Sequence, residues 1–195
     1  MALAQLESSE CTKYTTIQPL EDQRKSTDSE IVIGLVGAVG TDLDKVATVI
    51  SDRLKKYVYK THIIIVSKTI LCNIFNVGEI ADEFNRINKY MDLGNKLRSK
   101  IHQGILAEGV ANTIHDLRLA EGKQPILKRT AFIVKSLKNE AEVRFLREIY
   151  GNGFYLISVY TDEDTRSTNL NAKIFDKQNV KKGSVRHWFM LLGSD

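Results

Sequence analysis

The sequence predicts a three-layer α/β/α fold built on a mostly parallel sheet. Short apolar segments rich in β-branched residues alternate with longer segments whose apolar residues recur at helical spacing, which is the pattern of βαβ units. A glycine-rich turn at residues 34–41 joins the first apolar segment directly to the first helix. A chain of 195 residues is long enough for one such domain with a hydrophobic core.

The composition is that of an ordinary globular protein, with 43% hydrophobic and 27% charged residues. The net charge of +4 suits phosphorylated small molecules as well as nucleic acids. Because Cys11 and Cys72 are the only cysteines, neither a disulfide framework nor a cysteine-rich zinc site is expected. The sequence has no apolar run of membrane-spanning length and no signal-peptide pattern, so we expect a cytoplasmic protein with no membrane partner.

Three segments are predicted along the chain. Residues 1–30 are polar, mixed in charge and without periodicity, as in a solvated tail. Residues 31–166 form the domain, and residues 167–195 are expected to be a C-terminal extension or a truncated linker toward a missing domain. Residues 185–192 form a compact apolar patch that either packs on the sheet or meets further chain or a partner.

Four strands are expected, the first of which runs from residue 31 to the glycine turn. The others lie at residues 61–66, 129–134 and 154–160. The second is a continuous apolar run, which predicts burial on both faces of the sheet. His62, at its start, is interpreted as an ordinary edge residue rather than a ligand.

The first helix is expected to begin at Thr41, because Thr41 and Asp44 form a capping-box signal. Residues 67–80 mix helical spacing with helix-breaking residues. A longer helical region then runs to about residue 101, and Gly94 interrupts it.

Another helix covers residues 103–120. Asn139 and Glu142 form a second capping box, which starts a helix that ends before Gly151. Residues 161–172 are polar and follow the end of a strand, where α/β sheets bind ligands. A solvated loop is favoured there over a flexible lid that carries Arg166.

The glycine turn matches a phosphate-binding P-loop, G-x-x-x-x-G-K-[ST], only in part. Starting from Gly34, Thr41 supplies the final hydroxyl, but Val39 replaces the second glycine and Gly40 replaces the lysine. The following Asp42 would add negative charge beside an anion. Two interpretations stay open: a modified nucleotide site, or a plain βα turn that uses glycines for its geometry.

The sequence lacks much of the machinery for catalysis. A phosphoryl-transfer enzyme needs a lysine on the phosphates, a metal ligand and cations for the developing charge. The third strand ends near Lys135 and Lys138 rather than at an acidic residue that would help to hold Mg²⁺. The zinc motif of nucleotide deaminases, H-x-E with P-C-x-x-C, is also missing from the sequence.

Two segments together resemble a known family. The first is IVIGLVGAVGTDL at residues 31–43, and the second comprises SLKNEAEV at 136–143 and IYGNGF at 149–154, with GNKLR at 94–98 between them. This set resembles the amino-terminal, P-loop-kinase-like domain of the antiphage deoxycytidylate deaminases, bacterial proteins that join such a domain to a zinc-dependent deaminase. That domain is itself similar to deoxynucleoside monophosphate kinases.

The resemblance covers roughly residues 30–166 and implies a P-loop nucleotide kinase-like fold. It implies a bound nucleotide, such as a nucleoside triphosphate, with or without Mg²⁺. Zinc would belong only to the missing deaminase domain, so neither catalytic nor metal-binding residues are expected in this chain. The cofactor-binding residues that the resemblance implies are Gly37, Val39, Gly40, Thr41, Asp42, Asn95 and Arg98.

The leading hypothesis is a non-catalytic, nucleotide-binding regulatory domain of the deoxycytidylate deaminase type. It would sense a nucleotide or a phage-derived signal and hold a deaminase domain in check, in cis or in trans, and it is compatible with a homo-oligomer. The alternative is a deoxynucleoside monophosphate kinase in which Lys45 or Lys135 replaces the missing lysine. A third hypothesis is an interaction module that works through the patch around Trp188.

Overall fold

A computed structural model describes residues 29–78, 80, 82–122 and 125–175. Within them, four parallel strands form one sheet in the order β2-β3-β1-β4. The strands are β1 (Ile31–Gly37), β2 (Lys60–Ile65), β3 (Thr130–Leu137) and β4 (Phe154–Val159). The prediction of an α/β fold on a mostly parallel sheet is therefore confirmed.

The described helices alternate with these strands. They are α2 (Leu43–Lys56), α3 (Cys72–Phe75), α4 (Glu83–Lys100), α5 (Ile105–Ala120), α6 (Glu140–Tyr150) and α7 (Glu163–Phe175). A π-helical turn, η2 (Val66–Leu71), leads into α3, and a 3₁₀ turn, η3 (Gly151–Gly153), follows α6.

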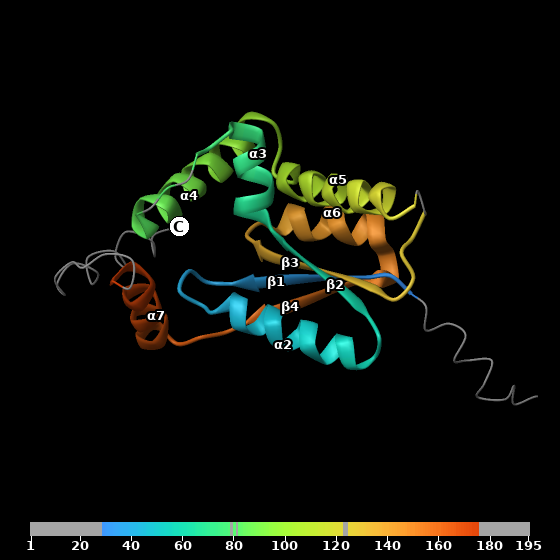
Figure 1. The fold of residues 1–195 in the computed structure, drawn as a ribbon. Coiled ribbons are helices and arrows are strands. Elements are labelled where there is room, and N and C mark those ends of the chain that lie inside the picture. The colour runs from blue at the N-terminus through green and yellow to red at the C-terminus, as the bar shows by residue number, and fades with distance from the viewer. Residues whose placement is uncertain (1–28, 79, 81, 123–124, 176–195) are drawn as a thin grey trace, which may run out of the picture.

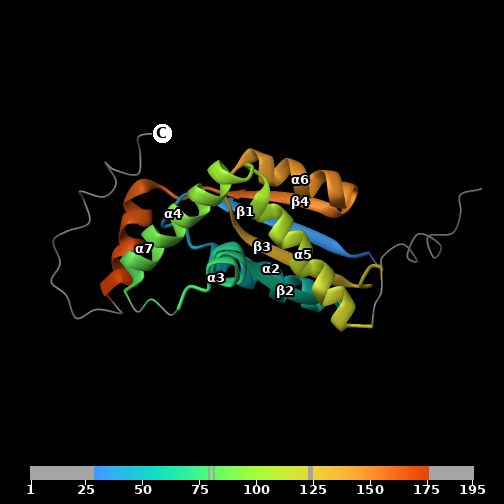
Figure 2. The same ribbon diagram turned by 90° about the horizontal axis from the view of Figure 1, so that it is seen from above.

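Helices cover both faces of the sheet, as three layers require. In Figure 1, α2 lies on one face and α5 and α6 lie on the other. Successive residues of β3 pack on opposite faces of the sheet. Phe132 belongs to the core cluster that includes Leu146 of α6, and Ile133 belongs to the cluster that includes Ala47 of α2. Both views place α4 and α7 beyond the carboxyl end of β1 (Figure 2).

The expectation that the second strand is buried on both faces is wrong. In the part of the chain that the structure describes, β2 pairs only with β3 and is an edge strand, and Ile63 is 44% exposed whereas Ile64 is buried. The apolar run therefore marks β-propensity rather than complete burial. His62 lies in this edge strand and stacks on Phe132 with 5.5 Å between the ring centroids.

The first helix begins later than predicted. Asp42 is the N-cap of α2, and its side chain accepts a hydrogen bond from the backbone N–H of Lys45. Thr41 belongs to the preceding turn, since its N–H donates to the carbonyl of Ala38 at 3.0 Å. The capping box of Thr41 and Asp44 is therefore wrong, because Asp42 provides the cap.

The capping box of α6 is confirmed: the Asn139 side chain accepts from the helix, and Glu142 reaches back to the N-cap N–H. Gly94 does not interrupt α4, which is continuous through that position. A Cβ atom at Gly94 would lie 3.2 Å from Nη1 of Arg98, so this glycine gives the guanidinium room.

The expectation of a solvated loop at residues 161–172 is wrong for most of that range, which belongs to α7. The Asp162 side chain accepts from the N–H of Thr165 at 2.8 Å, which is the geometry of an N-cap. The predicted domain boundary at residue 166 falls inside this helix. The C-terminal patch at 185–192 lies outside the described residues.

A β-bulge shapes the end of β3. The register with β1 shifts so that Lys135 pairs with Leu35 but Leu137 pairs with Val36. Ser136 is the extra residue and has φ +70°. Lys135, before the bulge, faces α2 as Ile133 does, and the extra residue returns Leu137 to the opposite core, which also contains Val134.

The substitution Asn139→Ala should destabilise the fold by about 1 kcal/mol, because it removes one half of the capping box. The matched control is Asn85→Ala in the first turn of α4, where Asp82 supplies the cap and alanine favours the helix. Urea unfolding measures both variants. Equal stability of Asn139→Ala and the unmodified chain would contradict the role of this cap.

Candidate functional site

A cavity of about 450 Å³ opens at the carboxyl edge of the sheet. Its walls are the glycine turn after β1, the bulged end of β3, the π-helical turn η2, and helices α4 and α7. The order of the strands places β1 and β3 side by side, and the chain leaves them toward opposite sides of the sheet. Open parallel sheets bind ligands at such a point.

Helix α7 packs against the glycine turn. The Asn169 side chain donates to the carbonyl of Gly40 at 3.0 Å, and Arg166 donates to that of Val39 at 3.4 Å. Gly40 has φ +88°, and a Cβ atom there would lie 2.6 Å from the carbonyl oxygen of Arg166. Gly40 thus allows both the turn and the close approach of α7.

Most of the cofactor-binding residues predicted from the sequence line this cavity. They are Gly37, Val39, Gly40, Thr41, Asn95 and Arg98. Asp42 is the exception, because its side chain caps α2 and it does not belong to the lining. Segments that are far apart in the sequence therefore meet at one place.

Arg98 is engaged in an internal ion pair. Its Nε and Nη2 atoms donate to Oε1 of Glu142 at 2.9 and 2.8 Å. The Glu142 side chain is fully buried, and its other oxygen accepts from the N–H groups of Lys138 and Asn139. Asn95 in turn accepts from Arg98 at 3.3 Å. This network ties α4 to the start of α6.

Lys135 also has an internal partner. Its ammonium forms an ion pair with the carboxylate of Asp44 in the first turn of α2. The Lys135 side chain is 6% exposed and that of Asp44 is 66% exposed. Lys173 of α7 lies 3.7 Å from the second oxygen of the same carboxylate. Partial burial opposes ionisation of Asp44, but the two lysines outweigh it and lower its pKa.

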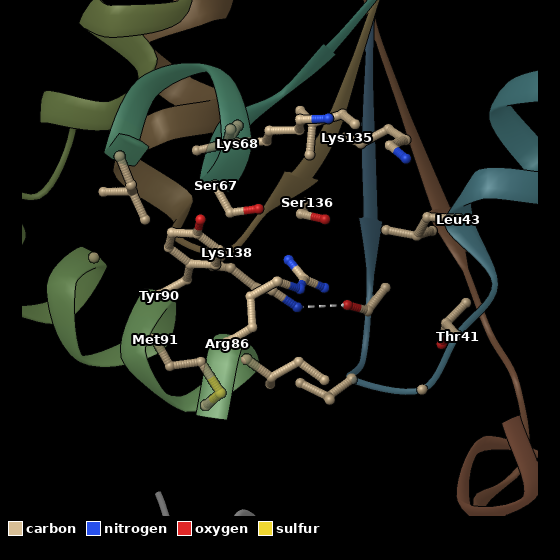
Figure 3. Close-up of a pocket in the computed structure, with 18 of the residues that line it drawn as sticks. Thr41, Leu43, Ser67, Lys68, Arg86, Tyr90, Met91, Lys135, Ser136 and Lys138 are labelled. Carbon is tan, nitrogen blue, oxygen red and sulfur yellow. Dashed lines mark hydrogen bonds between the residues drawn. The ribbon is translucent and has the colours of Figure 1, made fainter. Parts of the chain in front are cut away.

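Lys138 reaches into the cavity. Its ammonium donates to the carbonyl of Gly37 at 3.0 Å. Figure 3 shows Lys138 and Arg86 extending into the cavity, with the hydroxyls of Ser67 and Ser136 facing the same space. The surrounding protein partly desolvates the ammonium, and together with the charge of Arg98 this lowers the pKa of Lys138, although much of the residue is exposed.

Thr41 stands at the position of the final hydroxyl residue in the P-loop pattern. Its Oγ1 atom is buried and has no hydrogen-bond partner among the residues that the structure describes. In Figure 3 it lies at the margin of the cavity, away from Arg86 and Lys138. An unsatisfied buried hydroxyl costs about 1–3 kcal/mol, so this one is available to a ligand or to water.

The sequence-based prediction of the site missed Lys68, Arg86, Lys173 and Asp44, all of which line the cavity. On a helix, a charged residue gives no sequence signal that separates a ligand contact from a solvated face. Only the tertiary structure, which brings η2, α4, α7 and the first turn of α2 to one cavity, singles these residues out.

Within the described residues, no cluster of histidine, cysteine, aspartate or glutamate is arranged to hold a metal ion. None of the described helices is long and apolar enough to span a lipid bilayer. No protein-family model matches this chain, and no curated protein matches its sequence. The family resemblance and the nucleotide therefore stay predictions.

The substitution Gly40→Ala should destabilise the chain by about 1–3 kcal/mol more than Gly122→Ala does. Gly122 is the matched control because it has φ +108° with no atom within 4 Å of an added Cβ. Both variants carry the strain of positive φ, but only the first collides with α7. Urea unfolding measures the difference, and equal losses would mean that α7 does not pack as described.

The substitution Arg98→Ala should cost about 3–5 kcal/mol, because it leaves the buried carboxylate of Glu142 without its cation. The control is Arg144→Ala, which breaks an exposed pair with Glu140 and should change stability by less than about 1 kcal/mol. If Arg98→Ala kept full stability in urea unfolding but lost ligand affinity, Arg98 would be a ligand contact instead.

Proposed function

We propose that this domain has a P-loop nucleotide kinase-like fold and binds a nucleotide without transferring its phosphoryl group. The observation that carries the proposal is the charge of the cavity at the carboxyl ends of β1 and β3. Six cationic and two acidic side chains are among its described lining residues. The cationic ones are Lys68, Arg86, Arg98, Lys135, Lys138 and Lys173. Arg86 pairs with Glu83 and Arg98 with Glu142, and the net charge of the cavity with these partners included is still positive, which attracts anions.

A second wall of the cavity favours a nucleotide over inorganic phosphate. Helix α4 and its neighbours contribute apolar and aromatic side chains: Leu71, Ile87, Tyr90, Met91 and Leu106. Arg86 and Arg98 lie on α4 itself, and the other cations come from η2, the end of β3 and α7. A ligand that joins an anionic group to a flat, largely apolar base is complementary to this combination of side chains, and the volume is that of an ordinary small-molecule site.

The loss of catalysis rests on particular residues. Gly40 replaces the P-loop lysine, and the nearest buried lysine, Lys135, is neutralised by Asp44. The end of β3 supplies Lys135 and Lys138 where an acidic residue would help to hold Mg²⁺. These features support binding and weigh against phosphoryl transfer.

The regulatory part of the proposal rests on the sequence resemblance. A nucleotide bound at this edge would control a deaminase domain in cis or in trans, and that domain would hold the zinc. Helix α7 would link the cavity to such a partner, since it contacts the glycine turn and precedes residues 176–195 in the sequence. Homo-oligomers and a cytoplasmic location belong to the same proposal.

The alternative function is a deoxynucleoside monophosphate kinase that uses a displaced lysine. Of the two candidates, Lys135 lines the cavity and Lys45 does not. Turnover of about 1–100 s⁻¹ that Lys135→Ala abolishes and Lys45→Ala preserves would favour this alternative over the binding-only proposal.

Thermal unfolding with each nucleoside mono- and triphosphate, with and without Mg²⁺, tests nucleotide binding. A ligand at 100 times its Kd should add about 2.7 kcal/mol of stability. Calorimetry should then show that Lys138→Ala weakens affinity about tenfold or more, because it removes a charged donor from the cavity.

The control for that prediction is Lys96→Ala, an exposed lysine of α4 outside the cavity lining, which should leave affinity unchanged. Failure of every nucleotide to stabilise the protein would contradict the proposal. So would equal affinities of Lys138→Ala and Lys96→Ala, which would place the ligand elsewhere.

A further inference from the structure

Asp44 is out of place in a cavity for anions. It lies in the first turn of α2, where the glycine turn meets the helix and where a bound phosphate would be expected. Its carboxylate is nevertheless held there by two lysines from distant parts of the chain, Lys135 of β3 and Lys173 of α7. The Asp44 carboxylate therefore occupies a position with the charge complementarity of an anion site.

The two lysines have different surroundings. Lys135 is buried and faces the cavity at the bulge of β3, so it needs a negative partner close by. Lys173 is 45% exposed and is carried by a helix that also binds the glycine turn through Asn169. The single carboxylate of Asp44 therefore pairs with a buried lysine of β3, Lys135, and with a more exposed lysine of α7, Lys173.

A ligand phosphate would serve the same two lysines. It has more acceptor oxygens and more negative charge than a carboxylate, and Lys138 lines the same cavity. It cannot use Lys135 fully while Asp44 does, since two anions at one place repel each other. Phosphate binding and the ion pair of Asp44 are therefore alternatives.

We propose that the carboxylate of Asp44 is an internal competitor for the phosphate group of the ligand, and that binding requires its displacement from Lys135 and Lys173. This inference rests on the proposed function, because it concerns the regulation of the same cavity. Displacement would transfer Lys173 from Asp44 to the ligand. Occupancy of the cavity would in this way change how α7 is attached to the first turn of α2.

The substitution Asp44→Asn tests the competition, since it keeps the size of the side chain and removes its charge. Calorimetry with pyrophosphate, and with whichever nucleotide stabilises the unmodified protein most, should show an affinity increase of about tenfold or more. The same variant should be less stable without ligand, because Lys135 loses its partner. The control is Asp52→Asn on the same helix, where the exposed carboxylate pairs with Lys55 outside the cavity and affinity should not change.

Lys135→Met and Lys173→Ala backgrounds separate competition from a general charge effect. If Asp44 competes for these lysines, the gain from Asp44→Asn should shrink in either background. Lys173→Ala serves this purpose even if Lys135→Met fails to fold, because the Lys173 side chain is largely exposed. An undiminished gain in both backgrounds would overturn the proposal.

The remaining outcomes distinguish the two proposals. If the unmodified protein binds and Asp44→Asn binds no better, the competition is wrong and the nucleotide site stands. If only Asp44→Asn binds, the competition is supported. If neither chain binds pyrophosphate or any nucleotide, both proposals fail.

Discussion

A buried lysine at the end of a strand must have a negative partner, and the site is arranged around meeting that requirement. Lys135 faces α2, on the same side of β3 as Ile133, and Asp44 of α2 forms an ion pair with it. The same carboxylate also pairs with Lys173, which lies on α7. Two ion pairs that share the Asp44 carboxylate therefore join the sheet, α2 and α7.

The basic residues that line the cavity have different roles. Arg98 stabilises the fold, because its guanidinium is committed to the buried Glu142, and it lines the cavity because α4 lies beyond the carboxyl end of β1 (Figure 1 and Figure 2). Among the described residues, the Lys138 ammonium donates to the carbonyl of Gly37 and forms no ion pair, so it can donate to an anion as well. A count of basic residues would give Arg98 and Lys138 the same role. Their hydrogen-bond partners indicate instead that Arg98 stabilises the fold and that Lys138 can bind an anion.

Much of the fold follows from local signals in the sequence. The strands and most helices were predictable because β-propensity, helical periodicity and the Asn139–Glu142 cap act within a few residues. The exposure of β2 could not be predicted from the sequence, because a strand's place at the sheet edge depends on the pairing of distant segments. Gly94 was misread for a similar reason: it admits a side chain that belongs to a tertiary ion pair.

The site was predictable only in part, and for the same physical reason. The glycine turn has a sequence signature because its backbone geometry requires glycine at Gly40. Helix α7 resembles a polar loop in sequence, since its stability depends on its contacts with the turn rather than on a broad apolar face. The partnership of Asp44 with Lys135 spans 91 positions of the chain and has no local signal.

The central claim is that a nucleotide binds at the carboxyl ends of β1 and β3, and amide chemical-shift mapping of the labelled protein tests it most directly. Titration with the nucleotide that stabilises the protein most should shift the amide signals of Gly40, Asp44 and Ser136 first and furthest. The signals of Tyr155 and Leu156, on the exposed edge strand β4, should stay in place. Shifts centred on β4, or no saturable shifts at the glycine turn, would contradict the account.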